Sequence, residues 1–544
     1  MKLFQAVSFQ TSLVARLSVL LAAVAVMPAT SARAADGPKR GGTLTAIVQP
    51  EPVTLTPAFN TATPTQIVAG NIFDGLVYYD PALKPQPSLA TEWKVAEDGL
   101  TISFNLRKSV KWHDGKPFSS ADVKWSLENV WKTIHPRNKA IFENVAMVDT
   151  PDDNTIILHL SKPSLPILSV LNAVGAPILP KHLYEGTDIL NNAYNNKPVG
   201  TGAFVFKEWK KGEYILLERN PDYWEPAKPY LDKVIFRIIP DAAARAAAIE
   251  KGEVQYATFN PVSFREVERL AKLPSLKVDT GGYDWLSPVL YLDFNVENQY
   301  LKDVRVRQAI AFALDKEALG KVVWYGYGKP AVSPVPTALT AFHDASVPKY
   351  PFDLKKAEAL LDEAGFKRGP DGVRFTLNHD FLPYGDDYKR TGEYLKQALK
   401  RVGIEINIRA QDTAAFIKRV YADRDFDISS SYNGAFPDPQ IGVVREYWSG
   451  WLGSKTPWTN GSGYRNAEVD GLIQAAAVEG NPKKRTEDFN RFQQIVQRDL
   501  PTLPLLELRF FTLHSSALKD VVLQADQSYG SLKNAWFDQA PAQN

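Results

Sequence analysis

The 544-residue chain contains no cysteine. This absence excludes disulfide bonds, thiolate metal sites and lipid attachment through a cysteine. Long apolar runs are also missing. The one clear run, residues 17–27, has 11 residues and is too short to cross a bilayer as a helix. With 44% hydrophobic and 11% aromatic residues, the chain is expected to be globular and held together by packing alone.

Signatures of catalysis and metal binding are scarce. No two of the seven histidines are three or four residues apart, and neither H-E-x-x-H nor G-x-S-x-G occurs. An S-x-x-K match at 516–519 lacks its companion motifs. A G-x-G-x-x-A match at 326–331 follows a predicted helix and contains a proline. We therefore expect no enzyme, no metal site and no cofactor.

Neither positive nor negative charge is in large excess. The chain has 63 basic and 61 acidic residues, a formal net charge of +2 at pH 7. Proteins that bind nucleic acid usually carry a strongly basic face, so this balance argues against a nucleic-acid partner.

The first 34 residues have the order of a secretory signal peptide. Lys2 and Arg16 precede the apolar run, and Ala32-Arg33-Ala34 forms a small-x-small cleavage site. The mature chain is expected to begin near Ala35, and an uncleaved anchor is the alternative. A protein exported without an anchor stays with its cell only if a second membrane retains it, so we expect a periplasmic location.

The remaining length, about 510 residues, exceeds the ~250–300 residues at which single cores stop growing, so two or more lobes are expected. The first half mixes strands with a few helices. Alternating or β-rich segments predict strands, a glycine turn at 211–213 predicts a hairpin, and Ser119 or Ser120 can cap a helix. The strands are expected at 43–48, 101–106, 155–160, 203–209, 214–218 and 234–239, and the helices at 120–131 and 241–251.

From about residue 303, helices alternate with short apolar strands, which is typical of an α/β lobe. The helices are expected at 303–320, 353–364, 386–402, 413–423, 467–477 and 482–499. The strands are expected at 375–378, 404–408, 426–429 and 505–510.

Four sequence blocks identify a family. They are 104–118 with 121–123; 198–204 with 219–221 and 223–224; 303–309 with 313–315; and 464–466 with 469–470. In this order they resemble the peptide/nickel-type (oligopeptide- and dipeptide-binding, family 5) solute-binding proteins of ABC transporters, over nearly the whole mature chain. The blocks also read as turns and helix starts, so we expect them to be architectural.

The resemblance implies an α/β fold, a two-lobed periplasmic-binding-protein clamshell of class II (cluster C) with an extra side domain. Domain I would comprise 35–75, 199–295 and 509–544, domain II (the side domain) 76–198, and domain III (the second lobe) 296–508. Strands crossing near 292–296 and 505–510 would form the hinge. The protein, expected to be a monomer, would capture a peptide-like solute and deliver it to a membrane permease and its ATPase.

The resemblance also implies ligand-binding residues. In peptide-binding relatives an aspartate of the second lobe pairs with the ligand's amino terminus, and Asp438 is the matching position. A charge-assisted hydrogen bond would suit an ammonium group there. The other residues expected to line the cleft are Tyr432, Asn433, Phe436, Trp458, Trp285, Glu51 and Thr63.

One departure leaves the solute open. Dipeptide-binding members carry an arginine that binds the ligand carboxylate, but residues 380–385 contain none, and Arg390 lies on the following helix. Longer peptides, opines and oligosaccharides remain alternatives on the same scaffold, and a nickel chelate is disfavoured by the absence of a histidine-rich patch. A chemoreceptor partner is not distinguished from transport. A secreted hydrolase is the alternative from another class.

Overall fold

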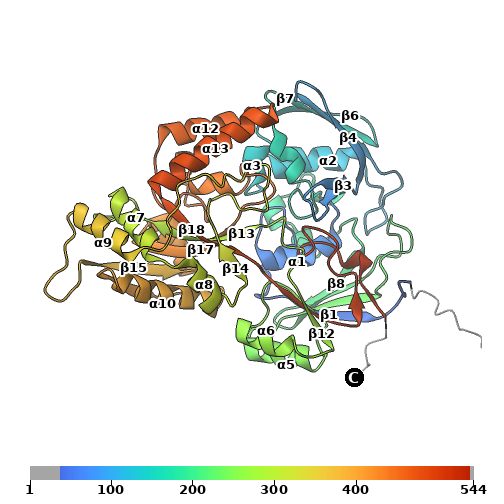
Figure 1. The fold of residues 1–544 in the computed structure, drawn as a ribbon. Helices are drawn as coiled ribbons and strands as arrows, with labels where there is room; N and C mark the ends of the chain where they lie inside the picture. The colour runs from blue at the N-terminus through green and yellow to red at the C-terminus, as the bar shows by residue number, and fades with distance from the viewer. Residues whose placement is uncertain (1–36, 539–544) are drawn as a thin grey trace, which may run out of the picture. The chain divides into compact units, whose positions relative to one another are not determined.

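The computed structural model describes residues 37–538. A seven-stranded sheet, in the order β12-β19-β11-β1-β10-β9-β8, forms what we call the first lobe. Its strands come from distant parts of the chain: β1 (Thr43–Ile47), β8 (Phe204–Lys210), β9 (Tyr214–Arg219), β10 (Lys233–Arg237), β11 (Tyr256–Ala257), β12 (Leu276–Asp279) and β19 (Thr512–Ser515). Helices α1 (Thr63–Ile72), α5 (Ala242–Glu250) and α6 (Phe264–Leu270) accompany this sheet (Figure 1).

A four-stranded antiparallel sheet organises the side domain. Its order is β4-β5-β7-β6, with β4 (Ala90–Val95), β5 (Thr101–Leu106), β7 (Thr155–Leu160) and β6 (Val145–Asp152). Buried bonds tie this part to the first lobe: Asn172 Nδ2 donates to Asp526 Oδ2 at 2.6 Å, and the backbone N–H of His113 donates to the Gly200 carbonyl at 2.9 Å. Gly200 has no room for a side chain, because a Cβ there would lie 1.9 Å from the Ile72 carbonyl oxygen.

A six-stranded mixed sheet forms the second lobe, in the order β14-β18-β13-β17-β15-β16. The strands are β13 (Pro288–Phe294), β14 (Gly328–Pro330), β15 (Phe375–Phe381), β16 (Ile404–Arg409), β17 (Ile428–Gly434) and β18 (Thr502–Leu508). The helices are α7 (Val304–Ala313), α8 (Lys316–Val322), α9 (Leu354–Glu363), α10 (Asp386–Lys400), α11 (Thr413–Ile417), α12 (Ala467–Val478) and α13 (Pro482–Asp499). All seven residues of β13 and of β18 are buried, as strands covered on both faces require.

The chain passes between the two larger sheets twice. Residues 280–287 connect β12 of the first lobe to β13 of the second, and residues 509–511 connect β18 to β19. β13 lies within the range expected for domain I, yet it pairs with β17 and β18 in the second-lobe sheet. No helix within residues 37–538 is long and apolar enough to cross a membrane.

Aspartate residues cap the starts of several helices. Asp241, Asp353 and Asp412 each accept a hydrogen bond from a backbone N–H in the first turn of the following helix. The prediction of a single helix over 303–320 is wrong, because this segment forms two helices. Asp315 leaves the helical conformation, and its carboxylate accepts from the Ala318 N–H at 2.9 Å, which starts α8.

Candidate functional site

A buried aromatic contact joins the 280–287 connection, the second lobe and the side domain. Trp285, in the 280–287 connection, is fully buried, and its ring centroid lies 5.0 Å from that of Phe436 in the loop after β17. The Trp285 Nε1–H donates to the Ser169 carbonyl of the side domain at 3.3 Å. Phe436 also faces the side domain, since the Cζ atom of Arg137 lies 4.6 Å from its ring centroid. Two of the residues predicted to line the cleft, Trp285 and Phe436, are therefore in contact.

Hydroxyl groups of both lobes lie together close by. The side chain of Thr63, at the start of α1, lowers the pKa of the phenols of Tyr432 in β17 and of Tyr529 near the C-terminus. Burial raises the pKa of the Tyr432 phenol well above its ordinary value and that of Tyr529 to about 12. Both phenols therefore stay protonated at neutral pH.

Replacing Thr63 with valine should weaken closure of the lobes. The change keeps the shape and removes the hydroxyl, so it should lower solute affinity by about fivefold if the hydroxyl contributes about 1 kcal/mol to the closed state. Titration calorimetry checks this, with Thr61→Val in the same segment as the control. Equal affinity of Thr63→Val and wild type would contradict a role for the Thr63 hydroxyl.

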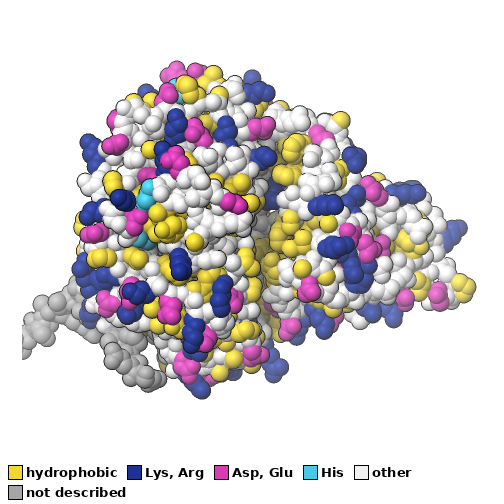
Figure 2. Space-filling view, turned by 180° about the vertical axis from the view of Figure 1, so that it is seen from behind, with side chains coloured by type: hydrophobic (Ala, Val, Ile, Leu, Met, Phe, Trp, Pro, Cys, Tyr) yellow, Lys and Arg dark blue, Asp and Glu magenta, His cyan; other side chains and the backbone are white. Residues whose placement is uncertain are grey.

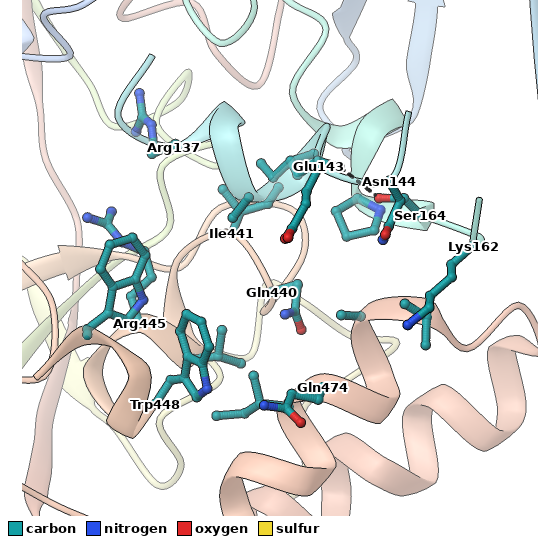
Figure 3. Close-up of a pocket in the computed structure, with 18 of the residues that line it drawn as sticks. Arg137, Glu143, Asn144, Lys162, Ser164, Gln440, Ile441, Arg445, Trp448 and Gln474 are labelled. Atoms are coloured by element: carbon teal, nitrogen blue, oxygen red, sulfur yellow. Dashed lines mark hydrogen bonds between the residues drawn. The ribbon is translucent and has the colours of Figure 1, made fainter. Parts of the chain in front are cut away.

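A cavity of about 320 Å³ lies between the side domain and the second lobe. The side domain contributes residues around α3 (Asn138–Ile141) and residues 162–166, and the second lobe contributes residues 440–451 and the C-terminal part of α12. Figure 3 shows Arg137 and Arg445 at one end of this cavity, Lys162 at the other and Gln440 between them. Figure 2 shows the surface hollowed along a furrow with hydrophobic side chains on both edges.

The charged groups that line the cavity are mostly basic. They are Arg137, Lys162 and Arg445, with Glu143 as the acid among the lining residues. Trp448 and Trp451 add aromatic surface, and Gln440, Gln474, Asn144 and Ser164 add hydrogen-bonding groups. Such a lining, apolar with a few polar groups, is typical of small-molecule sites.

Asp438, the residue predicted to bind a ligand ammonium, has a buried protein partner. Its two carboxylate oxygens each accept from Arg485 of α13 at 2.7 Å, and its Oδ1 also accepts from the Gln440 backbone N–H at 2.9 Å. Both side chains are almost fully buried. The pair fixes the 435–441 loop, and with it Gln440 and Ile441, against α13. The ligand role of Asp438 stays a prediction.

Two buried acids lie behind this loop. Burial raises the pKa of Glu446, and the nearby Asp293 of β13 raises it further, while the Asn433 amide donates to the Glu446 carboxylate. Burial also raises the pKa of Asp293 to about 7, and its Oδ1 has no hydrogen-bond partner. Asn433, another predicted cleft residue, is thus held by the protein's own carboxyl group.

Stability should fall with rising pH because of Asp293. Its pKa in the folded state is above its ordinary value of 3.8, so its stabilising contribution is complete below about pH 4 and is lost as pH rises through about 7. Urea unfolding at pH 5 and pH 8 should show wild type losing up to about 2.6 kcal/mol relative to Asp293→Asn between these values. A difference that does not change with pH would contradict the raised pKa.

Two predicted residues lie in other surroundings. Glu51 accepts from the Trp209 Nε1–H at 2.9 Å and from the Gly212 backbone N–H at 3.0 Å, so it braces the β8–β9 hairpin. Trp458 packs against Tyr421 of the second lobe, with ring centroids 6.2 Å apart. None of the eight residues predicted to bind the ligand, these two included, lines the cavity between the side domain and the second lobe.

The arginines of the cavity were missed by sequence reasoning. Arg137 follows His135-Pro136 in a connection, and Arg445 lies in a short 3₁₀ turn, Val443–Glu446. No local motif distinguishes them from surface arginines, because only the fold brings the two segments together. Among residues 37–538, no group of three or more His, Asp or Glu side chains is placed to hold a metal ion.

Comparison with known proteins places this geometry in context. Residues 84–453 match the family described as bacterial extracellular solute-binding proteins, family 5 Middle. The chain is 27% identical over 503 residues to the glutathione-binding protein GsiB of Salmonella choleraesuis, covering 88% of this chain and 91% of the relative.

Solved structures are similar over almost the whole chain. The periplasmic binding protein DppA from Helicobacter pylori, in complex with the peptide STSA, has a TM-score of 0.79 at 27% identity and covers 92% of this chain and 99% of its own. AgaA from Agrobacterium tumefaciens R10, in complex with agropinic acid, has a TM-score of 0.75 at 26% identity, with 92% and 99% coverage.

Proposed function

The chain belongs to family 5 of the bacterial extracellular solute-binding proteins, and we propose that it binds a small peptide-like solute between its lobes and delivers it to an ABC importer. The observation that carries the choice of solute is the cavity of about 320 Å³. This volume is at the lower end of the ~300–1,000 Å³ of small-molecule sites, which favours a solute of a few residues over a long peptide. The names of relatives that bind glutathione and the peptide STSA support the same class.

Closure about the two connections would couple binding to delivery. In this proposal, domain I (35–75, 199–295 and 509–544) and the side domain (76–198) move together, because buried hydrogen bonds join them. The second lobe (296–508) moves relative to both, with β13 following the second-lobe sheet and residues 280–287 and 509–511 acting as the hinge. A solute that contacts both sides favours the closed state by its stronger binding there.

The protein would act as a monomer in the periplasm and meet a permease and its ATPase at the inner membrane, without nucleic acid, a cofactor or a catalytic step. Lys, Arg, Asp and Glu side chains are interspersed on the face shown in Figure 2, as expected for a protein without a nucleic-acid partner.

A second candidate solute is an opine. AgaA, similar over 92% of this chain, is named for its complex with agropinic acid, and the basic lining of the cavity suits an acidic solute.

A thermal-shift screen of mature protein separates these candidates. Di- to tetrapeptides and glutathione form one set, opines a second, and oligosaccharides and nickel with histidine a third. A tight solute at one hundred times its Kd stabilises by ~2.7 kcal/mol, which is readily measured. We expect stabilisation within the peptide set. Stabilisation by sugars alone would overturn the proposed solute, and hydrolysis of a peptide during incubation would overturn the absence of catalysis.

A further inference from the structure

Two arginines reach the same end of the cavity from different domains. Arg137 reaches it from the side domain and Arg445 from the second lobe. Within residues 37–538, no Asp or Glu oxygen lies close enough to either guanidinium to form an ion pair. The Nη2 atom of Arg137 is buried with no hydrogen-bond partner, and Arg445 Nη2 donates to the Pro457 carbonyl at a long 3.3 Å.

Other buried arginines of this chain are satisfied. Arg485 makes a bidentate pair with Asp438, and Arg307 donates to the carbonyl oxygens of Leu301, Asp499 and Leu500. A buried guanidinium without such partners is unfavourable, because its desolvation is not compensated. Arg137 stacks on the Phe436 ring, but its buried Nη2 has no acceptor among residues 37–538, and this points to an acceptor group supplied from outside the chain.

The electrostatics at the Arg137–Arg445 end of the cavity also favour an anionic group there. The pKa of Arg137 is lowered to about 10. Burial is the main cause, and the nearby positive charge of Arg445 adds to it. Glu446, next to Arg445 in sequence, raises the pKa of Arg445, and Asn433 donates to the Glu446 carboxylate. Arg137 has no such acid among the causes that set its pKa, and it feels the positive charge of Arg445 across the boundary between side domain and second lobe.

We propose that a carboxylate of the solute binds between Arg137 and Arg445, so that the transported solute is one with a free carboxylate. Arginine suits this role because its planar guanidinium matches a carboxylate in a bidentate arrangement. Gln440 Oε1, a buried acceptor in the same cavity with no partner, would accept an N–H of the same solute. This inference deepens the proposed function and rests on it, since it assigns ligand chemistry to the same site.

The pair also gives a reason for closure to require solute. Without an anion, repulsion between the two guanidiniums disfavours bringing the second lobe against the side domain. A carboxylate between them changes the interaction from repulsive to attractive. This difference in interaction energy stabilises the closed state relative to the open state. The proposed site is therefore both a selectivity determinant and a coupling element.

The first experiment needs no knowledge of the natural solute. The melting temperature of mature protein is measured in sodium acetate and in sodium chloride at equal ionic strength and pH. Acetate should raise the melting temperature of wild type and not that of Arg137→Gln or Arg445→Gln. Lys139→Gln, an exposed lysine two residues from Arg137, is the matched control and should respond as wild type. No acetate effect on wild type, or an equal effect in all variants, would overturn the carboxylate site.

The second experiment separates this inference from the proposed function. Di- to tetrapeptides with a free C-terminal carboxylate and the same peptides as C-terminal amides are offered together in equilibrium dialysis, with mass spectrometry as the readout. Wild type should favour the free acids by about thirtyfold or more, and Arg137→Gln should lose this preference. Equal binding of acids and amides would overturn the inference and leave peptide binding intact. An acetate effect without binding of any peptide would overturn the peptide-like solute and keep the carboxylate site.

Discussion

Asp438→Asn should lower the free energy of unfolding by about 3–5 kcal/mol, because it leaves the buried guanidinium of Arg485 without its charge partner. The partner is held by two 2.7 Å hydrogen bonds, and the substitution removes the negative charge without changing the size of the side chain. Urea unfolding measures the loss.

A double-mutant cycle with Arg485→Gln tests the pairing itself. If the two side chains stabilise each other, the double variant should lose less than the sum of the single losses. The same variants decide the ligand role predicted for Asp438. Near-normal stability with an affinity loss of about 2–5 kcal/mol would assign Asp438 to the ligand, and a stability loss with normal affinity of the folded fraction would assign it to the loop.

Trp285→Ala should have a comparable effect on stability, about 3–5 kcal/mol. The side chain is 1% exposed and contacts all three parts of the molecule, through Phe436, Tyr529 and the Ser169 carbonyl. Removing it leaves a cavity where the lobes and the side domain meet, so solute affinity should fall as well. Trp285→Phe, which keeps most of the apolar volume, is the conservative control. A loss below about 1 kcal/mol for the alanine variant would contradict a packing role at this junction.

The fold class and much of the element order could be predicted from sequence. Alternating residues predicted strands at 101–106 and 155–160, which β5 and β7 confirm, and the α/β two-lobed architecture is confirmed as well. The strand at 426–429 was placed too early, since β17 runs over Ile428–Gly434 and its serines carry no apolar signal. The break at Asp315 was missed because a capping aspartate inside an apolar pattern resembles an exposed helical residue.

The site could be predicted only in part. Trp285, Phe436, Tyr432 and Thr63 lie where the lobes meet, and their ligand-binding role stays a prediction. The partner of Asp438 lies 47 residues away on α13, and no local pattern pairs the two. Arg137 and Arg445 come from different domains. What distinguishes them is that the fold brings both to one cavity and leaves the buried Nη2 of Arg137 without a hydrogen-bond partner among residues 37–538.

Identification of the solute that accompanies the protein tests the central claim most directly. Protein purified from the native periplasm without added ligand is denatured, and the released small molecules are identified by mass spectrometry. The account predicts a small peptide or another amino-acid-derived solute with a free carboxylate, released by wild type and reduced in Arg137→Gln. A neutral sugar released in stoichiometric amount from both proteins would contradict it.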